Sequence, residues 1–194
     1  GVMESSVSVE AGSTQYLTYY ISGSYNGKEN AQQNMQALVG KEVSAFEQKK
    51  QRYQSFADMT QLSTPDEDLN QTFKWLKYNA DWFVRTVPGI GTGIAAGYPD
   101  YPWWFGCDSE YALQGYMAIG QYETALKTLK LLYELSEKEN GNGRIVHEIS
   151  SNGAVFNPGN INETPQFPTL VWDVYQWTGD KALLETYFLT IQKG

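Results

Sequence analysis

Two short helix–glycine–helix joints constrain the fold of this chain more than any other feature. They read Ala118-Ile119-Gly120-Gln121 and Trp177-Thr178-Gly179-Asp180. Glycine adopts the left-handed conformation that ends many helices, and a joint this short returns the next helix antiparallel to the one before it. The two joints therefore predict two αα-hairpins and a mainly helical fold.

Capping signals and apolar spacing predict five helices in the second part of the chain. The first begins in the capping box Thr64-Pro65-Asp66-Glu67 and ends before Pro88-Gly89. Its apolar stripe consists of Leu69, Phe73, Leu76, Ala80, Phe83 and Val87. The other four are expected from about Asp108 to Gly120, Tyr122 to Lys138, Thr164-Pro165 to Gly179, and from Asp180 onward. The helical spacing of Trp172 and Trp177 predicts that both belong to the core.

The first 63 residues have a different character. Alternating apolar residues on both sides of the Ala11-Gly12-Ser13 turn predict two strands. Two strands alone are only marginally stable, so we interpret residues 1–27 as the end of a β-domain. Residues 28–63 are rich in Gln and Lys and predict helical linker segments. The expected organisation is thus 1–27, 28–63 and a helical domain over 64–194.

Two long loops are expected at the end of the hairpins opposite the glycine joints. They cover residues 88–108 and 140–163, and the alternation of helix direction places both on one rim. Loops of this length are commonly functional. For residues 64–194 we therefore expect a mainly α fold, in which helical hairpins form part of an α/α toroid with a cleft on the loop rim.

The first loop contains the densest aromatic segment of the chain. Residues 98–110 hold five aromatic rings, two prolines and three carboxylates. Aromatic faces pack against the C–H faces of sugars, and carboxylates accept protons from sugar hydroxyls. We therefore predict carbohydrate binding by Trp103, Trp104 and Phe105, with Asp108 as the hydroxyl acceptor. The alternative is an aromatic edge of the core with Asp108 as a plain helix N-cap.

The second loop supplies directional hydrogen-bonding side chains of the kind that a sugar site needs, namely Arg144, His147, Glu148, Asn152, Asn157, Asn160 and Glu163. Glu148 and Glu163 are the best carboxylates among them, and each either faces a ligand or is solvated or bound to backbone. Gln166, in the first turn of the next helix, is predicted to point back into the cleft. A lone histidine such as His147 is more often structural than functional.

Composition and charge exclude several classes of partner. The net charge of −8 disfavours nucleic acid and anionic membrane, and no apolar run is long enough for a transmembrane helix. One cysteine, Cys107, excludes an internal disulfide, and one histidine argues against a histidine-based metal site. No cofactor or metal is expected. A neutral, polyhydroxylated ligand fits this balance, and the open edge of a toroid would allow self-association.

The aromatic segment also carries a resemblance. Trp104-Phe105-Gly106-Cys107-Asp108-Ser109 resembles the aromatic-x-x-Asp-Ser/Thr element of (α/α)6-barrel glycoside hydrolases, which include glycogen debranching enzymes, glucoamylases, trehalases and family 63 glucosidases. Residues 144–148 with 164–167 resemble their next substrate-side element. The chain is most similar to bacterial proteins called glycogen debranching enzyme-like or amylo-α-1,6-glucosidase-like, in which a β-sandwich and a helical linker precede the barrel.

The resemblance implies an inverting hydrolase of α-glucosidic linkages. It implies that Asp108 holds the sugar in the −1 subsite, with Trp103, Trp104 and Phe105 as walls. Many relatives carry arginine where Cys107 stands, so a hydroxyl-binding cation is missing here. In these families the general acid and base come from later loops, and no element before Gly194 matches them.

We therefore interpret the chain as the N-terminal half of a barrel and expect no hydrolysis by residues 1–194 alone. Two alternatives remain open at this point. One is a non-catalytic sugar-binding module on the same half-toroid, and the other is a helical scaffold that binds protein through its aromatic residues.

Overall fold

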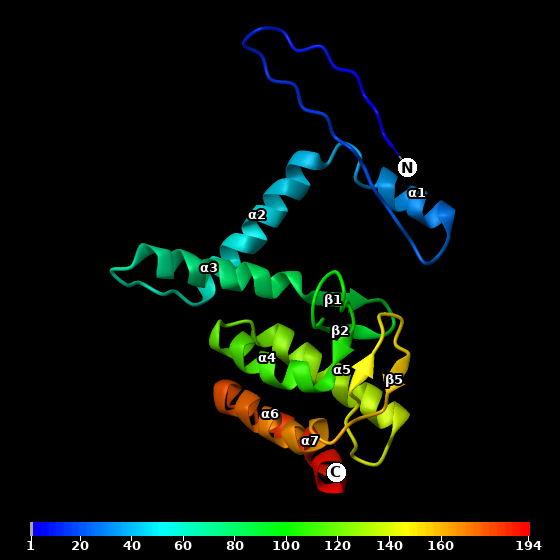
Figure 1. Cartoon of the computed structure of the whole chain (residues 1–194), viewed down its shortest axis with the longest axis vertical. Coiled ribbons are helices and arrows are strands. Elements are labelled where there is room, and N and C mark those ends of the chain that lie inside the picture. The colour runs from blue at the N-terminus through cyan, green and yellow to red at the C-terminus, as the bar shows by residue number, and fades with distance from the viewer. Residues whose placement is uncertain (1) are drawn as a thin grey trace. The chain divides into compact units, whose positions relative to one another are not determined.

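A computed structural model describes residues 2–194 of the chain (Figure 1). Over this range it contains seven helices and five short strands. The chain divides into two compact units, one reaching to Arg52 and the other covering Tyr53–Gly194. None of the helices in the described range is both long and apolar enough to cross a membrane.

The first part of the N-terminal unit is extended. Its turn is present, because Gly12 has a φ of 78° and the Ser13 amide donates to the Glu10 carbonyl at 3.0 Å. However, residues 2–27 contain no strand, so the two predicted strands are wrong for this segment. Neither stretch has a partner for ladder hydrogen bonds, and apolar side chains such as Val7 and Leu17 are exposed. That the segment ends a β-sandwich stays a prediction.

Two helices follow the extended segment, as residues 28–63 predict. Helix α1 covers Lys28–Gln36 and α2 covers Glu42–Met59. The few large apolar side chains of residues 28–63 are mostly exposed, including Leu38 and Phe46, whereas Phe56 near the end of α2 is buried. The helical character of this region is thus confirmed, and its role as a linker stays a prediction.

Helix α3 (Glu67–Trp82) begins later and ends earlier than the sequence predicts. Its N-cap is Asp66, whose carboxylate accepts from the Leu69 amide at 3.1 Å, and not Thr64. The helix ends at Trp82 because Val84–Val87 forms strand β1. This strand pairs antiparallel with β2 (Gly91–Ile94), so the predicted last turn of the helix is wrong.

The apolar stripe predicted for this helix is also wrong in part. Leu69 and Leu76 are about half exposed, whereas Lys77 is buried. The Lys77 ammonium donates to the Ala57 carbonyl at 2.7 Å and to the Thr60 carbonyl at 2.5 Å. Carbonyls at a helix C-terminus have no partner within the helix, so a cation there stabilises the end of α2. A tertiary partner therefore decides which face of α3 is covered.

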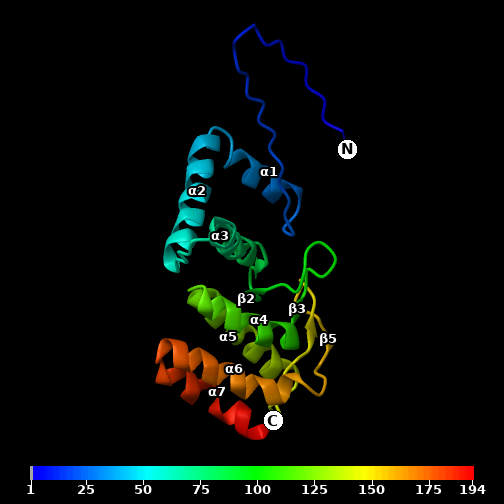
Figure 2. The same ribbon diagram turned by 60° about the vertical axis from the view of Figure 1, so that its left-hand side comes forward.

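Four helices build the two predicted hairpins (Figures 1 and 2). They are α4 (Gly106–Ala118), α5 (Tyr122–Glu139), α6 (Glu163–Thr178) and α7 (Lys181–Lys193). Both joints have the expected left-handed glycine, with φ of 83° at Gly120 and 68° at Gly179. Helix α4 packs against α5 and α6, and α6 packs against α7. The hairpins are thus confirmed, and their closure into a toroid stays a proposal.

The main core lies between these helices. It includes Leu113, Met117, Leu129, Phe167, Leu170, Val171 and Val174. Trp172 and Trp177 are not part of it, since 50% and 52% of their surfaces are exposed. The prediction that both are core residues is wrong because α6 turns its smaller apolar side chains towards α4.

The two long loops lie together at one end of the hairpins, as predicted. The first contains β3 (Trp104–Phe105), and the second contains β4 (Glu148–Ile149) and β5 (Val155–Asn157). These strands form one antiparallel sheet in the order β3-β4-β5. Figure 2 shows β3 and β5 at the same end of α4 and α6. Strand β3 runs directly into α4, so this sheet positions the first turn of that helix.

Candidate functional site

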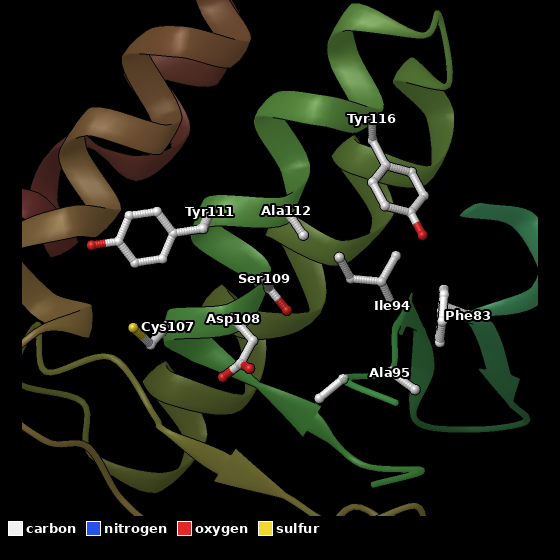
Figure 3. Close-up of a pocket in the computed structure, with 10 residues that line it drawn as sticks. Phe83, Ile94, Ala95, Cys107, Asp108, Ser109, Tyr111, Ala112 and Tyr116 are labelled. Atoms are coloured by element: carbon white, nitrogen blue, oxygen red, sulfur yellow. The ribbon is translucent and has the colours of Figure 1, made fainter. Parts of the chain in front are cut away.

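The first turn of α4 borders a hollow of about 590 Å³ (Figure 3). Helix α4 contributes Cys107, Asp108, Ser109, Tyr111, Ala112 and Tyr116, and the β1–β2 region contributes Phe83, Ile94, Ala95 and Ala96. Figure 3 shows Asp108 on the α4 side of the hollow and Ala95 across from it. The walls are thus mainly apolar, with one exposed carboxylate among them.

Asp108 does not cap the helix. The N-cap is Phe105, which makes no side-chain capping bond, and Asp108 is the third residue of α4. No hydrogen bond from another residue reaches its carboxylate anywhere in residues 2–194. The positive end of the helix dipole stabilises a negative charge at this position. The plain N-cap interpretation is therefore wrong, and the carboxylate is available to a ligand.

The aromatic walls predicted for this site lie elsewhere. The hollow has aromatic residues on its walls, but they are Phe83, Tyr111 and Tyr116. Trp104 is fully buried and packs with Leu131, Leu132 and Ile149 in a second core cluster. It cannot contact a ligand there, which corrects its predicted role as a sugar-binding residue. Its position follows from strand alternation, because Trp104, Ile149 and Val155 share the face of the small sheet that meets α5.

The opposite face of this sheet carries a more polar row. Phe105, Glu148 and Asn157 are paired across the three strands. The Phe105 ring packs edge-on against His147, with centroids 5.5 Å apart. Glu148 is half-buried, and no residue in the described range hydrogen-bonds to its carboxylate. Phe105 and Glu148 thus remain candidate ligand-binding residues at the loop end.

Glu163 has a structural position instead. Its side chain is 1% exposed, its Oε1 lies 2.5 Å from Nδ1 of His147, and its Oε2 accepts from the Asn160 amide at 2.8 Å. Both oxygens therefore bind the protein itself, in line with the alternative that this carboxylate is bound to backbone. We correct its predicted role from ligand binding to holding the second loop against α6. His147 joins it in this role.

Gln166 on α6 contacts two of the residues that line the hollow. Its Nε2 donates to the Tyr111 hydroxyl at 2.7 Å, and its Oε1 lies 3.6 Å from Sγ of Cys107. Both partners line the hollow, but Gln166 itself does not, so its predicted role in ligand binding stays a prediction. Burial, followed by the charge of Glu163, raises the pKa of the Cys107 thiol. Cys107 therefore stays protonated at neutral pH and is a poor nucleophile.

Glu110 is the residue of this region that sequence reasoning missed. It is 3% exposed, and neither carboxyl oxygen has a hydrogen-bond partner among the described residues. Burial, and then the nearby charge of Glu163, raise the pKa of Glu110 to about 9. The group is thus a neutral acid at pH 7. Nothing in the local sequence around Glu110, which lies two residues after Asp108, predicts that its side chain is buried.

We expect Glu110→Gln to stabilise the chain more at pH 8 than at pH 5.5. In the unfolded chain the carboxyl ionises at about pH 4.3, whereas the folded state keeps the proton up to about pH 9. Unfolding therefore releases a proton between these values, and wild-type stability falls as pH rises. Glutamine does not titrate, so its advantage should grow by about 3 kcal/mol over this interval.

Urea unfolding of the wild type and of Glu110→Gln at both pH values measures this difference. Glu185→Gln is the control, because Glu185 is exposed on α7. An advantage of equal size at pH 5.5 and pH 8 would show that Glu110 ionises normally in the folded chain.

The described residues contain no group of three or more His, Cys, Asp or Glu side chains suited to hold a metal ion. Comparison with protein families, with curated proteins and with solved structures finds no match for the chain. The functional proposal therefore rests on the geometry of the residues at the end of the hairpins where the two long loops meet.

Proposed function

We propose that this chain provides the sugar-binding part of a glycoside hydrolase that acts on α-glucosidic linkages. The observation that carries the proposal is the position of Asp108. Its carboxylate is exposed at the start of α4, beside a hollow of about 590 Å³, and is not used by the fold. A sugar hydroxyl donating to such a carboxylate makes a charge-assisted hydrogen bond.

The walls of the hollow fit the remaining surface of a pyranose ring. Phe83, Ile94 and Ala95 offer apolar contact to C–H groups, and the Tyr111 hydroxyl accepts from Gln166 at the rim. Sites for small neutral ligands are commonly built in this way, with apolar walls and a few placed polar groups. Glu148, on the polar face of the adjoining sheet, supplies a second carboxylate acceptor at the same end of the helices.

Hydrolysis with inversion requires a general acid and a general base about 6.5–9.5 Å apart, with room for water. Glu110 is a neutral acid, but both of its oxygens are buried away from the hollow surface. In this proposal the catalytic pair therefore comes from other loops of a complete (α/α)6 barrel, to which residues 64–194 contribute hairpins and the sugar-binding loops. We expect residues 1–194 to bind sugar without hydrolysing it.

Replacement of Asp108 by asparagine tests the proposal. The change keeps the size of the side chain but removes its charge and one acceptor oxygen. We expect affinity for maltose and isomaltose, measured by calorimetric titration of the 194-residue chain, to fall about thirtyfold. Stability should change by less than about 0.5 kcal/mol, because the residue does not cap α4.

Asp68→Asn is the matched control. Asp68 is also an exposed carboxylate in the first turn of a helix, but it belongs to α3 and lies outside the hollow. Its replacement should leave sugar affinity unchanged. Equal affinities of the wild type and Asp108→Asn for both disaccharides would remove Asp108 from the site and overturn the proposal.

A further inference from the structure

An aromatic pair outside the hollow joins the two long loops. The rings of Trp103 and Phe156 are stacked, with centroids 5.3 Å apart and planes 6° from parallel. Trp103 immediately precedes β3, and Phe156 is the middle residue of β5. Neither residue lines the hollow beside Asp108. The structure thus separates Trp103 from the site that the sequence assigned to it.

The fold holds this pair in place before any ligand arrives. The chain neighbour of Trp103 is Trp104, which is fully buried, and the neighbour of Phe156 is Val155, which packs on the same core cluster. Strand β4 pairs with both β3 and β5. Because both backbones are fixed by the sheet, the stack loses little conformational freedom when it binds a partner.

The outer ring of the stack is open to solvent. Phe156 is 64% exposed, and it lies where the register between β4 and β5 shifts, with its ring parallel to that of Trp103. Single exposed apolar residues are common on proteins and need no explanation. Here, however, the exposed face is flat, rigid and backed by a second ring, which is the shape that packs against the C–H face of a pyranose.

The loop that carries Phe156 also carries asparagine side chains. The side-chain oxygen of Asn160 accepts from the side-chain amide of Asn157 at 2.9 Å. The side-chain oxygen of Asn152 accepts from the backbone amide of Ala154 at 3.2 Å. The side-chain NH2 groups of Asn152 and Asn160 make no hydrogen bond to other described residues, and both side chains are exposed. Two donors therefore remain for hydroxyl oxygens of a ligand on the loop.

We propose that the Trp103–Phe156 stack is a second carbohydrate-binding surface, distinct from the Asp108 hollow, and that it receives a pyranose ring of an α-glucan oligosaccharide. In naming a saccharide as the ligand, the inference rests on the proposed function. A protein partner fits less well, because a stable protein interface buries roughly 800 Å² on each side, far more than one ring pair offers. The surface makes affinity depend on the length of the oligosaccharide.

Titration of the 194-residue chain with maltose, maltotriose and maltopentaose tests this dependence. Wild-type affinity should rise with length. Phe156→Ala should lower affinity for maltopentaose about tenfold, the effect of one aromatic contact, and leave affinity for maltose unchanged. Phe156→Tyr, which keeps a flat ring, should restore the wild-type values. Phe156→Leu keeps apolar volume without a flat face and should behave like Phe156→Ala.

Phe188→Ala is the matched control for the loss of an exposed phenylalanine. Phe188 is 59% exposed on α7, and no ring contact to another described residue involves it. The Phe188→Ala variant should bind all three sugars with wild-type affinity. Equal maltopentaose affinities of the wild type and both Phe156 variants, Ala and Leu, would overturn the proposal, and so would an equal loss for all three sugar lengths.

The same titrations separate this proposal from the proposed function. If Asp108→Asn binds normally while Phe156→Ala loses affinity for maltopentaose only, the Asp108 site fails and the second surface stands. If Asp108→Asn weakens binding and Phe156→Ala does not, the Asp108 site stands and the second surface fails. A wild-type chain that binds none of the three sugars overturns both. A change in sedimentation with Phe156→Ala, without a change in sugar affinity, identifies a protein interface and also overturns the second surface.

Discussion

Glu163→Ala is expected to lower the free energy of unfolding by about 4 kcal/mol, because it removes a buried carboxylate that two other groups use and leaves a cavity in its place. Glu163 is 1% exposed, and its two oxygens serve Nδ1 of His147 and the amide of Asn160. Alanine leaves both groups without the acceptor that they have in the folded chain. It also leaves a cavity beside Gly106, whose backbone is packed against the Glu163 side chain.

Two further variants test whether the loss of stability is specific to the buried carboxylate of Glu163. Glu163→Gln keeps the volume and one acceptor, so it should cost about 1–2 kcal/mol. Glu185→Ala removes an exposed carboxylate from α7 and should change stability by less than about 0.5 kcal/mol. Urea unfolding at pH 7 measures all three. A loss of sugar affinity in Glu163→Ala, without a loss of stability, would return Glu163 to the ligand-binding residues.

The sequence predicts the helices of the two hairpins because their ends are fixed locally. Gly120 and Gly179 have the left-handed conformation that few other residues adopt, and Asp180 caps α7 by accepting from the Ala182 amide. Each of these signals depends on residues within one turn of chain. The meeting of the two long loops follows from the alternating direction of the helices, so it too is predictable.

In the sequence of the β1–β2 hairpin, a strong helical pattern overlaps a weaker strand pattern. The apolar stripe of α3 extends in the sequence through Phe83 to Val87 and predicts helix over that range. Val84 to Val87 also alternates β-branched residues before Pro88-Gly89, which is a strand-and-turn pattern. The glycines at 91 and 93 decide in favour of the strand, because each lies directly against Leu131 of α5. Such a contact is tertiary and leaves no local signal.

The candidate site residues likewise divide into those with a local sequence signal and those whose placement depends on tertiary contacts. The position of Asp108 in the first turn of a helix is predicted correctly, because the signals of a helix start are local. Trp104 and Glu163 are misassigned because aromatic rings and carboxylates serve a core and a ligand equally well. The face of β3 on which Trp104 lies depends on strand register, and a shift of one residue reverses it, whereas the direction of Glu163 depends on where α6 begins. Glu110 is missed altogether, since burial of an unpaired carboxyl contradicts the usual preference of the residue.

Gly106→Ala should be nearly as destabilising as the loss of Glu163, at about 3 kcal/mol. Gly106 is the first residue of α4, at the point where β3 becomes helix. A Cβ atom there would overlap the carbonyl oxygen of Val146 and lie 2.9 Å from Cγ of Glu163. The backbone cannot move aside freely, because the Gly106 amide donates to the His147 carbonyl at 2.8 Å. The methyl group would therefore push the two loops apart.

Gly115→Ala supplies the control within the same helix. A Cβ atom at Gly115 meets nothing within 4 Å, and alanine is the better helix former, so this variant should gain about 0.5–1 kcal/mol. The opposite signs separate steric overlap from helix propensity. Since the overlap lies two residues before Asp108, Gly106→Ala should also weaken maltose binding, whereas Gly115→Ala should not. Equal stability changes in the two variants would mean that the loops are not packed against the start of α4, and that the position of Asp108 is not fixed by them.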